Sequence, residues 1–212
     1  ISGISSFEVD NYVPILENEF VMRWYCTNPP IKHEKIIGLP IGFEEAERDG
    51  GNQKILHEFL SKSHKNKRNK ILLPYHTLST NTARNEAASY LKELPFVDVQ
   101  TEKLKFDEYL ELLAKYKYCI CLEGAGFDTH RNYECLLVNT LPIMKQSNIK
   151  LIYDDWNLPY EFVTDWKSID KIFFTKLSNT RYNYNDVNEF FDVKSHLRRI
   201  LNDSCISSFR SG

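Results

Sequence analysis

The chain has 212 residues, 42% of them hydrophobic and 26% charged, a composition that indicates a globular fold and excludes an intrinsically disordered protein. The formal net charge of -2 excludes a protein that binds nucleic acid through overall positive charge. No apolar run is as long as a membrane span and no signal peptide is visible, so we expect neither a membrane span nor a nucleic-acid partner for this chain.

The start of the chain and its cysteines bear on its compartment. The first residue is Ile1 rather than Met, so we expect that a segment was removed, and a signal anchor is one such segment. The 5 cysteines lie mostly in apolar stretches, which favours reduced core residues over a disulfide framework or a metal site. Cys119 and Cys121 alternate on one predicted strand, which is a poor geometry for a zinc knuckle.

The first part of the chain, up to about residue 45, has little room for a core of its own, and it contains Trp24 and Asn28. The Gly50–Gly51 pair then breaks the chain, and a short helix follows. The basic run at 62–70 is either a solvated loop before a strand or an electropositive rim for a phosphate-bearing or acidic partner.

From residue 70 onward, apolar strands alternate with amphipathic helices. The predicted strands are KILLPY (70–75), FVDVQT (96–101), YCICL (118–122), LPIM (141–144) and YEFVTDW (160–166). The predicted helices are 80–94, 106–116 with Asp107 as its N-cap, 129–139, and a long C-terminal helix at 184–201. This alternation predicts a Rossmann-like α/β domain, with a parallel sheet covered on both faces.

The loop EGAGFDTHR (123–131) leaves the end of one predicted strand and opens a helix. In a parallel sheet, ligands bind beyond the carboxyl ends of the strands. Gly124 and Gly126 allow a close backbone approach, and a helix N-terminus favours an anion. Arg131 suits a phosphate and Glu134, on the same side of the helix, suits a ribose diol. Alternatively, these two residues form an ordinary surface ion pair.

Other readings of the motifs are less specific. The loop lacks the third glycine of the dinucleotide fingerprint, and no P-loop is present. Asp154 and Asp155 are adjacent, which is the wrong spacing for a metal-binding pair of carboxylates, and we expect them in a loop. On chemistry alone, two hypotheses stand: a transferase that uses a nucleotide sugar, and a nucleotide-binding module without catalysis.

The stretch EGAGFDTHRNYECLLVNTLPIMKQS (123–147) resembles the donor-site segment of the exostosin-like glycosyltransferases. The matching positions are Gly124, Gly126, Asp128, Thr129, His130, Arg131, Glu134 and Pro142. WYCTNPPIKHEKIIGLPIGFE (24–44) resembles an upstream segment of the same family. Its matching positions are Trp24, Asn28, His33, Lys35, Pro40, Ile41 and Gly42. A weaker third match ends at Trp166.

The resemblance implies a GT-B architecture and an inverting hexosyl- or pentosyltransferase. Its donor is a UDP-sugar, such as UDP-xylose, UDP-GlcNAc, UDP-glucuronate or UDP-galactose, and its acceptor is a glycan or glycoprotein. No cofactor and no metal are expected, because basic side chains and a helix N-terminus stabilise the leaving diphosphate in such enzymes. The compartment stays open between the cytoplasm, for a complete chain, and the Golgi lumen, for one that has lost an anchor.

The resemblance also implies site residues and a division of the chain. The expected nucleotide-sugar contacts are Asn28, Arg84, Thr101, Gly124, Ala125, Gly126, Asp128, Thr129, His130, Arg131 and Glu134. The general base is unknown, and the weak candidates are Glu8, Asp10 and His130. The expected units are a reduced or truncated acceptor-side half at 1–48, a linker at 49–69, the donor-binding domain at 70–180, and a C-terminal helix at 181–212 that packs back. The family often has Gly where this chain has Asn139, and Asn tolerates the positive φ of such a turn.

Overall fold

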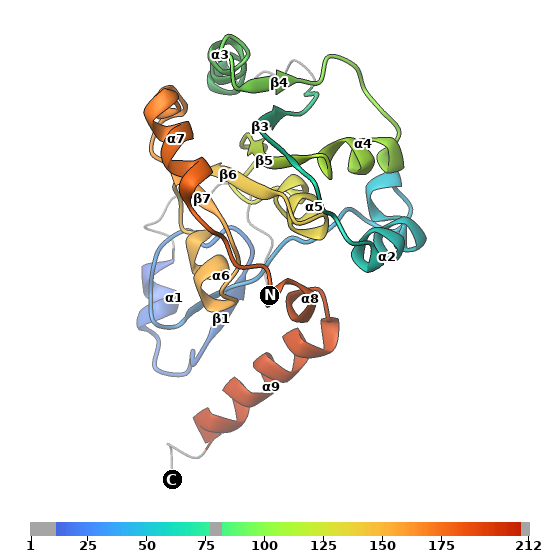
Figure 1. The fold of residues 1–212 in the computed structure, drawn as a ribbon. Coiled ribbons are helices and arrows are strands. Elements are labelled where there is room, and N and C mark those ends of the chain that lie inside the picture. The colour runs from blue at the N-terminus through green and yellow to red at the C-terminus, as the bar shows by residue number, and fades with distance from the viewer. Residues whose placement is uncertain (1–11, 77–81, 209–212) are drawn as a thin grey trace.

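The computed structural model of the chain describes residues 12–76 and 82–208, with side chains up to Asn202. Its centre is a parallel sheet of five strands in the order β4-β3-β5-β6-β7 (Figure 1). The strands are β3 (Arg68–Leu73), β4 (Val97–Val99), β5 (Tyr116–Cys121), β6 (Leu141–Lys145) and β7 (Glu161–Val163). Counted along the chain, this order is 2-1-3-4-5, as in flavodoxin-like doubly wound folds.

Helices cover both faces of this sheet and bury two separate clusters of apolar side chains. One cluster packs beneath α2 (Gln53–Ser61), α4 (Phe106–Leu113), α5 (His130–Leu137), α6 (Lys150–Asp155) and α8 (Val187–Phe190). The other packs beneath α3 (Thr82–Leu91), α7 (Lys171–Asn179) and the short 3-10 helix η3 (Trp166–Ser168). Because both faces are covered, the central strands read as continuous apolar runs, which is why the sequence predicted them.

The expectation of an α/β fold with a parallel sheet is therefore confirmed. Two local expectations are wrong. Asp107 does not cap α4: Lys105 precedes the helix, and its backbone N–H donates to the Glu108 carboxylate at 3.1 Å. Asp154 and Asp155 do not lie in a loop but end α6, where Asp154 pairs with Lys150 one turn earlier.

The N-terminal part of the described chain forms a small unit of its own. It consists of α1 (Val13–Glu17) and two short parallel strands, β1 (Trp24–Cys26) and β2 (Ile36–Gly38). Tyr12, Leu16, Cys26 and Ile36 are buried together within it. The unit lies against α6, because a side chain at Gly38 would come within 2.7 Å of Ile152. The sequence had suggested less core for this part than it has.

The segment expected as a linker at 49–69 is built into the main core. It holds the 3-10 helix η2 (Asp49–Gly51) and α2, and it ends in the first residues of β3. The Asn52 side chain caps α2, and Leu56 and Phe59 are buried against the sheet. Of the basic run at 62–70, Lys67 is partly buried and donates to the carbonyl of Ala114.

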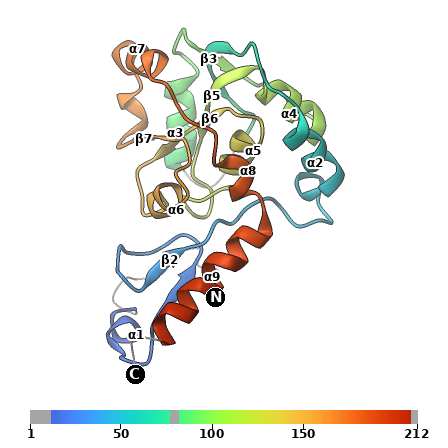
Figure 2. The same cartoon turned by 60° about the horizontal axis from the view of Figure 1, so that its bottom comes forward.

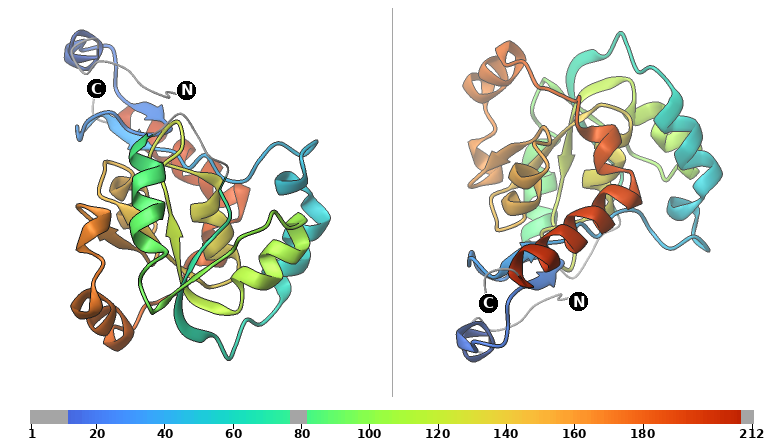
Figure 3. Two further views of the ribbon diagram at one scale, coloured as in Figure 1. Left: turned by 90° about the horizontal axis from the view of Figure 1, so that it is seen from above. Right: turned by 90° about the horizontal axis from the view of Figure 1, so that it is seen from below.

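The single long C-terminal helix that the sequence predicted is broken into α8 and α9 (Val193–Ser208). Beyond the break, α9 runs away from the sheet and alongside β1 and β2 (Figure 2). Figure 3 shows the molecule from two opposite sides, with α3 in front in the left view and α9 in front in the right view. These two helices therefore lie on opposite sides of the molecule. In the part of the chain that the structure describes, no helix combines the length and apolarity needed to cross a membrane.

Candidate functional site

The order of the strands reverses between β3 and β5, and the segments after these strands carry polar residues. A crevice beyond the carboxyl ends of the strands at such a switch point is the usual ligand site of doubly wound sheets. A cavity of about 550 Å³ lies there, which we call the switch-point cavity. It is lined by Glu44, Glu47, Arg48, Asp49, Gly50, Tyr75, Gln100, Lys103, Leu104, Phe106, Tyr109, Arg131 and Glu134.

Arg131 and Glu134, which the sequence singled out, both line this cavity from α5. Glu134 is only 9% exposed, and Arg131 Nη2 donates to the carbonyl of Tyr75 at 3.2 Å. Across residues 12–76 and 82–202, no ion pair joins Arg131 to Glu134. The alternative of a surface ion pair is therefore wrong, since both residues lie at a buried wall.

The charges of these two side chains influence each other without direct pairing. Burial raises the pKa of Glu134, and the Arg131 guanidinium opposes this increase. Burial also disfavours the charged form of Arg131, but Tyr109 and Glu134 outweigh it, so that the pKa of Arg131 lies above its usual value. The site thus holds a cationic guanidinium beside a carboxyl group, and the guanidinium limits the rise in the pKa of that carboxyl group.

One buried polar atom at this wall, Nε of Arg131, has no hydrogen-bonding partner within the described chain. A buried donor without a partner costs about 1–3 kcal/mol, so such a group requires an explanation. The Arg131 side chain lines the switch-point cavity, and a movement of this side chain toward an acceptor oxygen of a bound ligand would satisfy the donor.

Arg84, predicted as a second phosphate ligand, lies on α3, on the opposite face of the sheet from α5, and it does not line the switch-point cavity. Burial lowers the pKa of Arg84, and the nearby Arg131 guanidinium lowers it further. The two guanidinium groups are therefore close enough to repel each other, while Glu123 acts in the opposite direction. An anion bound between two such groups would relieve this repulsion.

Asn28 and Gly126, both expected to contact the ligand, contact each other instead. A side chain at Gly126 would come within 2.6 Å of the Asn28 Oδ1 atom, so glycine is required there by the approach of Asn28. Gly126 does not have a positive φ; Asn28 does, at 47°. The same Oδ1 atom accepts the backbone N–H of Asp128 at 2.7 Å. This pair therefore joins the loop to the N-terminal unit.

Asp128 is the centre of that junction rather than a group facing a ligand. Its side chain is 4% exposed. The carboxylate accepts the backbone N–H of Ile41 at 3.0 Å, the hydroxyl of Tyr133 at 2.6 Å and the amide of Asn132 at 3.2 Å. Burial raises the pKa of Asp128 to about 6, although these donors act to lower it. The expected role of Asp128 in nucleotide-sugar contact is therefore corrected to a structural one.

The remaining loop residues also differ from the expectation. A ring nitrogen of His130, Nδ1, is 2.8 Å from the carbonyl of Gly42, so His130 braces the loop. The Thr129 hydroxyl donates to Asn132, and the backbone N–H of Gly124 donates to the carbonyl of Gly126 at 3.0 Å. Gly124 and Ala125 are exposed and lie outside the switch-point cavity.

The candidates elsewhere in the chain have mixed outcomes. Thr101 is exposed and does not line the cavity, and its neighbour Gln100 does, with its side chain fixed to the backbone of Tyr75 and Glu102. Glu8 and Asp10, the weak candidates for a general base, lie outside the described residues.

Sequence reasoning missed Tyr75 and Tyr109. Tyr75 is the last residue of a predicted strand (70–75), so the strand-end rule could have found it. Nothing in the sequence marked Tyr109, because its place on α4 looks like any amphipathic position. The charged residues at 44–50 that line the cavity were equally unmarked.

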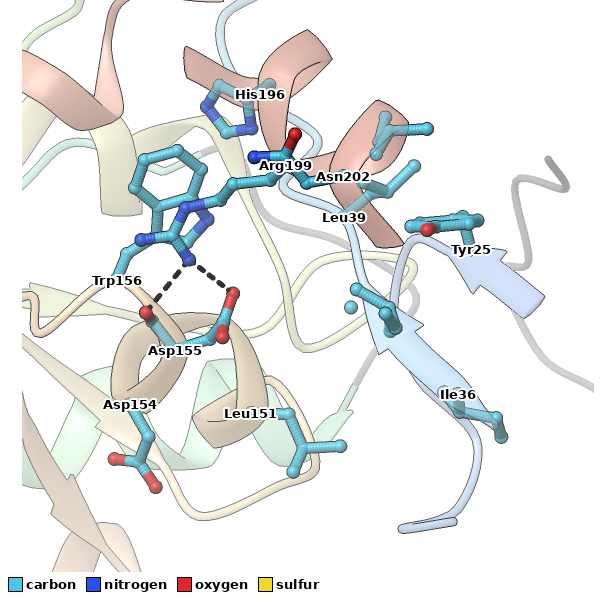
Figure 4. A pocket seen from close by; sticks show the side chains of 13 residues that line it. Tyr25, Ile36, Leu39, Leu151, Asp154, Asp155, Trp156, His196, Arg199 and Asn202 are labelled. Carbon is cyan, nitrogen blue, oxygen red and sulfur yellow. Dashed lines mark hydrogen bonds and ion pairs between the residues drawn. The ribbon is translucent and has the colours of Figure 1, made fainter. Parts of the chain in front are cut away.

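A second cavity, of about 620 Å³, lies between β2, α6 and α9. The Arg199 guanidinium lies 3.6 Å from the centroid of the Trp156 ring and bonds to the Asp155 carboxylate. Figure 4 shows it over this ring. Arg199 thus covers a face of Trp156 and neutralises Asp155. The charged groups of this cavity are used within the protein, so it is a weaker candidate for an anionic ligand.

The cysteines whose side chains the structure describes all lie in buried positions. Cys26, Cys119, Cys121 and Cys135 are free and buried, as expected for reduced core residues. The poor geometry expected of Cys119 and Cys121 for a zinc knuckle stays a prediction, but a third cysteine joins them. Alternate residues of a strand share one face, and the sulfurs of Cys119 and Cys121 meet that of Cys135 there, all within 4.8 Å of one another.

A comparison of the chain with models of known protein families gives no match. A comparison with curated proteins gives no significant match either. The resemblance to exostosin-like glycosyltransferases therefore depends on the motifs themselves.

Proposed function

We propose that this protein binds a nucleotide sugar in the switch-point cavity and transfers its sugar to a glycan acceptor with inversion. The proposal includes a GT-B type of architecture, a UDP-sugar donor and membership of the exostosin-like family. The observation that carries it is the placing of Arg131 and Glu134 at one buried wall of a cavity at the strand switch point, with Arg131 Nε lacking a partner.

Each part of the donor has a counterpart in this proposal. The diphosphate binds beside Arg131 at the cavity wall, where its negative charge would relieve the repulsion between Arg131 and Arg84. The Glu134 carboxylate accepts hydrogen bonds from the ribose hydroxyls. The base lies against the wall that holds Gln100 and Phe106, at the end of β4. The volume of about 550 Å³ is in the range of small-molecule sites.

The transfer step needs two contributions from the protein. The positive charge of Arg84 and Arg131 would stabilise the diphosphate as it leaves the sugar. A general base would take the proton of the acceptor hydroxyl as the new bond forms. His130 is a poor choice for this base, because one of its ring nitrogens is held by the Gly42 carbonyl.

The hydrogen bond that holds His130 supports a second candidate function, a nucleotide- or glycan-binding domain without catalysis. The two functions differ in turnover. We would incubate the protein with each of a panel of UDP-sugars, without acceptor, and measure the release of UDP. Slow release that Glu134→Gln reduces, and that the exposed Glu111→Gln leaves unchanged, supports the transferase. Binding without release of UDP from any donor supports the non-catalytic domain.

A further inference from the structure

Three cysteines form a compact group in the core, between the sheet and α5. Cys119 and Cys121 lie on β5 and Cys135 on α5, and they are 0%, 2% and 0% exposed. The Cys121 and Cys135 sulfurs are 3.6 Å apart, and all three sulfurs lie within 4.8 Å of one another. A disulfide bond is about 2.05 Å long, so these sulfurs are separate thiols.

These distances match those of three sulfurs around one metal ion. A metal–sulfur bond of about 2.3 Å gives a sulfur–sulfur distance of about 4.0 Å in a flat three-coordinate site. The observed distances, 3.6 Å between the Cys121 and Cys135 sulfurs and at most 4.8 Å for the other two pairs, bracket this value. A strand and the helix that follows it supply the three ligands, so the arrangement depends on the packing of this helix against the sheet.

The donor set also indicates which metal would bind. In the described part of the chain, no histidine or carboxylate joins the three sulfurs as a fourth ligand. Structural zinc takes four ligands in nearly all cases. Soft thiolates favour Cu(I), and the side chains around these sulfurs are buried and apolar. The positive charge of Arg131 acts on both Cys119 and Cys121 and would offset part of the negative charge of a thiolate site.

We propose that Cys119, Cys121 and Cys135 bind one Cu(I) ion in three-coordinate geometry. As each sulfur bonds to copper, its thiol proton leaves to solvent, and the oxidation state of the copper does not change. The site is separate from the switch-point cavity, so it does not depend on the proposed glycosyl transfer. Because α5 carries Cys135 as well as Arg131 and Glu134, copper would also hold the ligand-binding helix against the sheet.

The test is a titration of the reduced full chain with Cu(I), without oxygen and in competition with a chromophoric Cu(I) chelator. The expected result is one Cu(I) retained per chain by native mass spectrometry. X-ray absorption at the copper edge should then show three sulfur neighbours. The proposal is overturned if the folded wild-type chain leaves the copper with the chelator, or if the bound copper has nitrogen or oxygen neighbours.

Two variants make the assignment specific. Cys135→Ser should weaken Cu(I) binding at least tenfold, because it removes the one ligand that α5 supplies. Cys26→Ser is the matched control, since Cys26 is also fully buried but lies in the N-terminal unit. Its Cu(I) binding should equal that of the wild type. Equal binding by Cys135→Ser would overturn the proposal, and the wild-type titration decides the matter if that variant fails to fold.

Discussion

Asp128 gives the protein a pH-dependent stability whose sign follows from its burial. The pKa of this carboxyl rises from 3.8 to about 6 on folding, mainly through burial. The folded state therefore binds its proton more tightly than the unfolded state. The stabilising contribution is fully present below pH 3.8 and is lost as the pH rises through about 6. A difference of about 2 pKa units corresponds to about 3 kcal/mol.

The assay is urea unfolding of the wild type and Asp128→Asn between pH 4 and pH 7. Asparagine does not titrate, so the difference in unfolding free energy isolates the carboxyl group. We expect the unfolding free energy of the wild type, relative to that of Asp128→Asn, to fall by about 2 kcal/mol from pH 4 to pH 7. The fall is smaller than the full value of about 3 kcal/mol because part of the loss occurs below pH 4. Tyr133→Phe removes the donor at 2.6 Å, so it should move the decline to higher pH.

A difference that stays constant from pH 4 to pH 7 would refute the reasoning about Asp128. A difference that grows with pH would also refute it, and it would show that the donors from Ile41, Asn132 and Tyr133 outweigh burial.

Two further predictions concern packing and charge. Gly126→Ala should lower the unfolding free energy, measured in urea, by about 1–3 kcal/mol, because the new side chain would meet Asn28 at 2.6 Å. Gly124→Ala is the control: the nearest atom to its side chain is 3.8 Å away, so it should change the unfolding free energy by less than about 0.5 kcal/mol. Equal effects of the two substitutions would contradict this account. Arg199→Met should lower the unfolding free energy by about 1 kcal/mol, because it removes the charge over Trp156 and the half-exposed ion pair to Asp155. Urea unfolding followed by tryptophan fluorescence measures this change. An unchanged unfolding midpoint would show that neither contact contributes to stability.

The sheet was predictable because its strands are buried on both faces. Five of the six residues of β5 are buried, and β6 is buried along nearly its whole length, so each appears as an apolar run in the sequence. The positive φ expected at Asn139 is also present, at 54°. Such features are local, and residue type alone reports them.

The errors lie where distant segments meet. The loop around Gly126 was expected to face a ligand, but Asn28 and Ile41, about a hundred residues earlier, take up its polar groups. The C-terminal helix was expected to be continuous, but it breaks at Phe191 and Asp192. For Arg131 and Glu134 the local argument succeeded, because helical spacing alone puts them on one side of α5.

The central claim is that the switch-point cavity binds the nucleotide of the donor, and thermal unfolding with and without UDP tests it most directly. Saturation at about 100 times the dissociation constant stabilises a protein by about 2.7 kcal/mol, which corresponds to about 5–11 °C at this size. We predict this shift for the wild type and for Glu111→Gln, and its loss in Glu134→Gln and Arg131→Lys. A folded wild type that shows no shift, or an equal shift in all four proteins, would contradict the account.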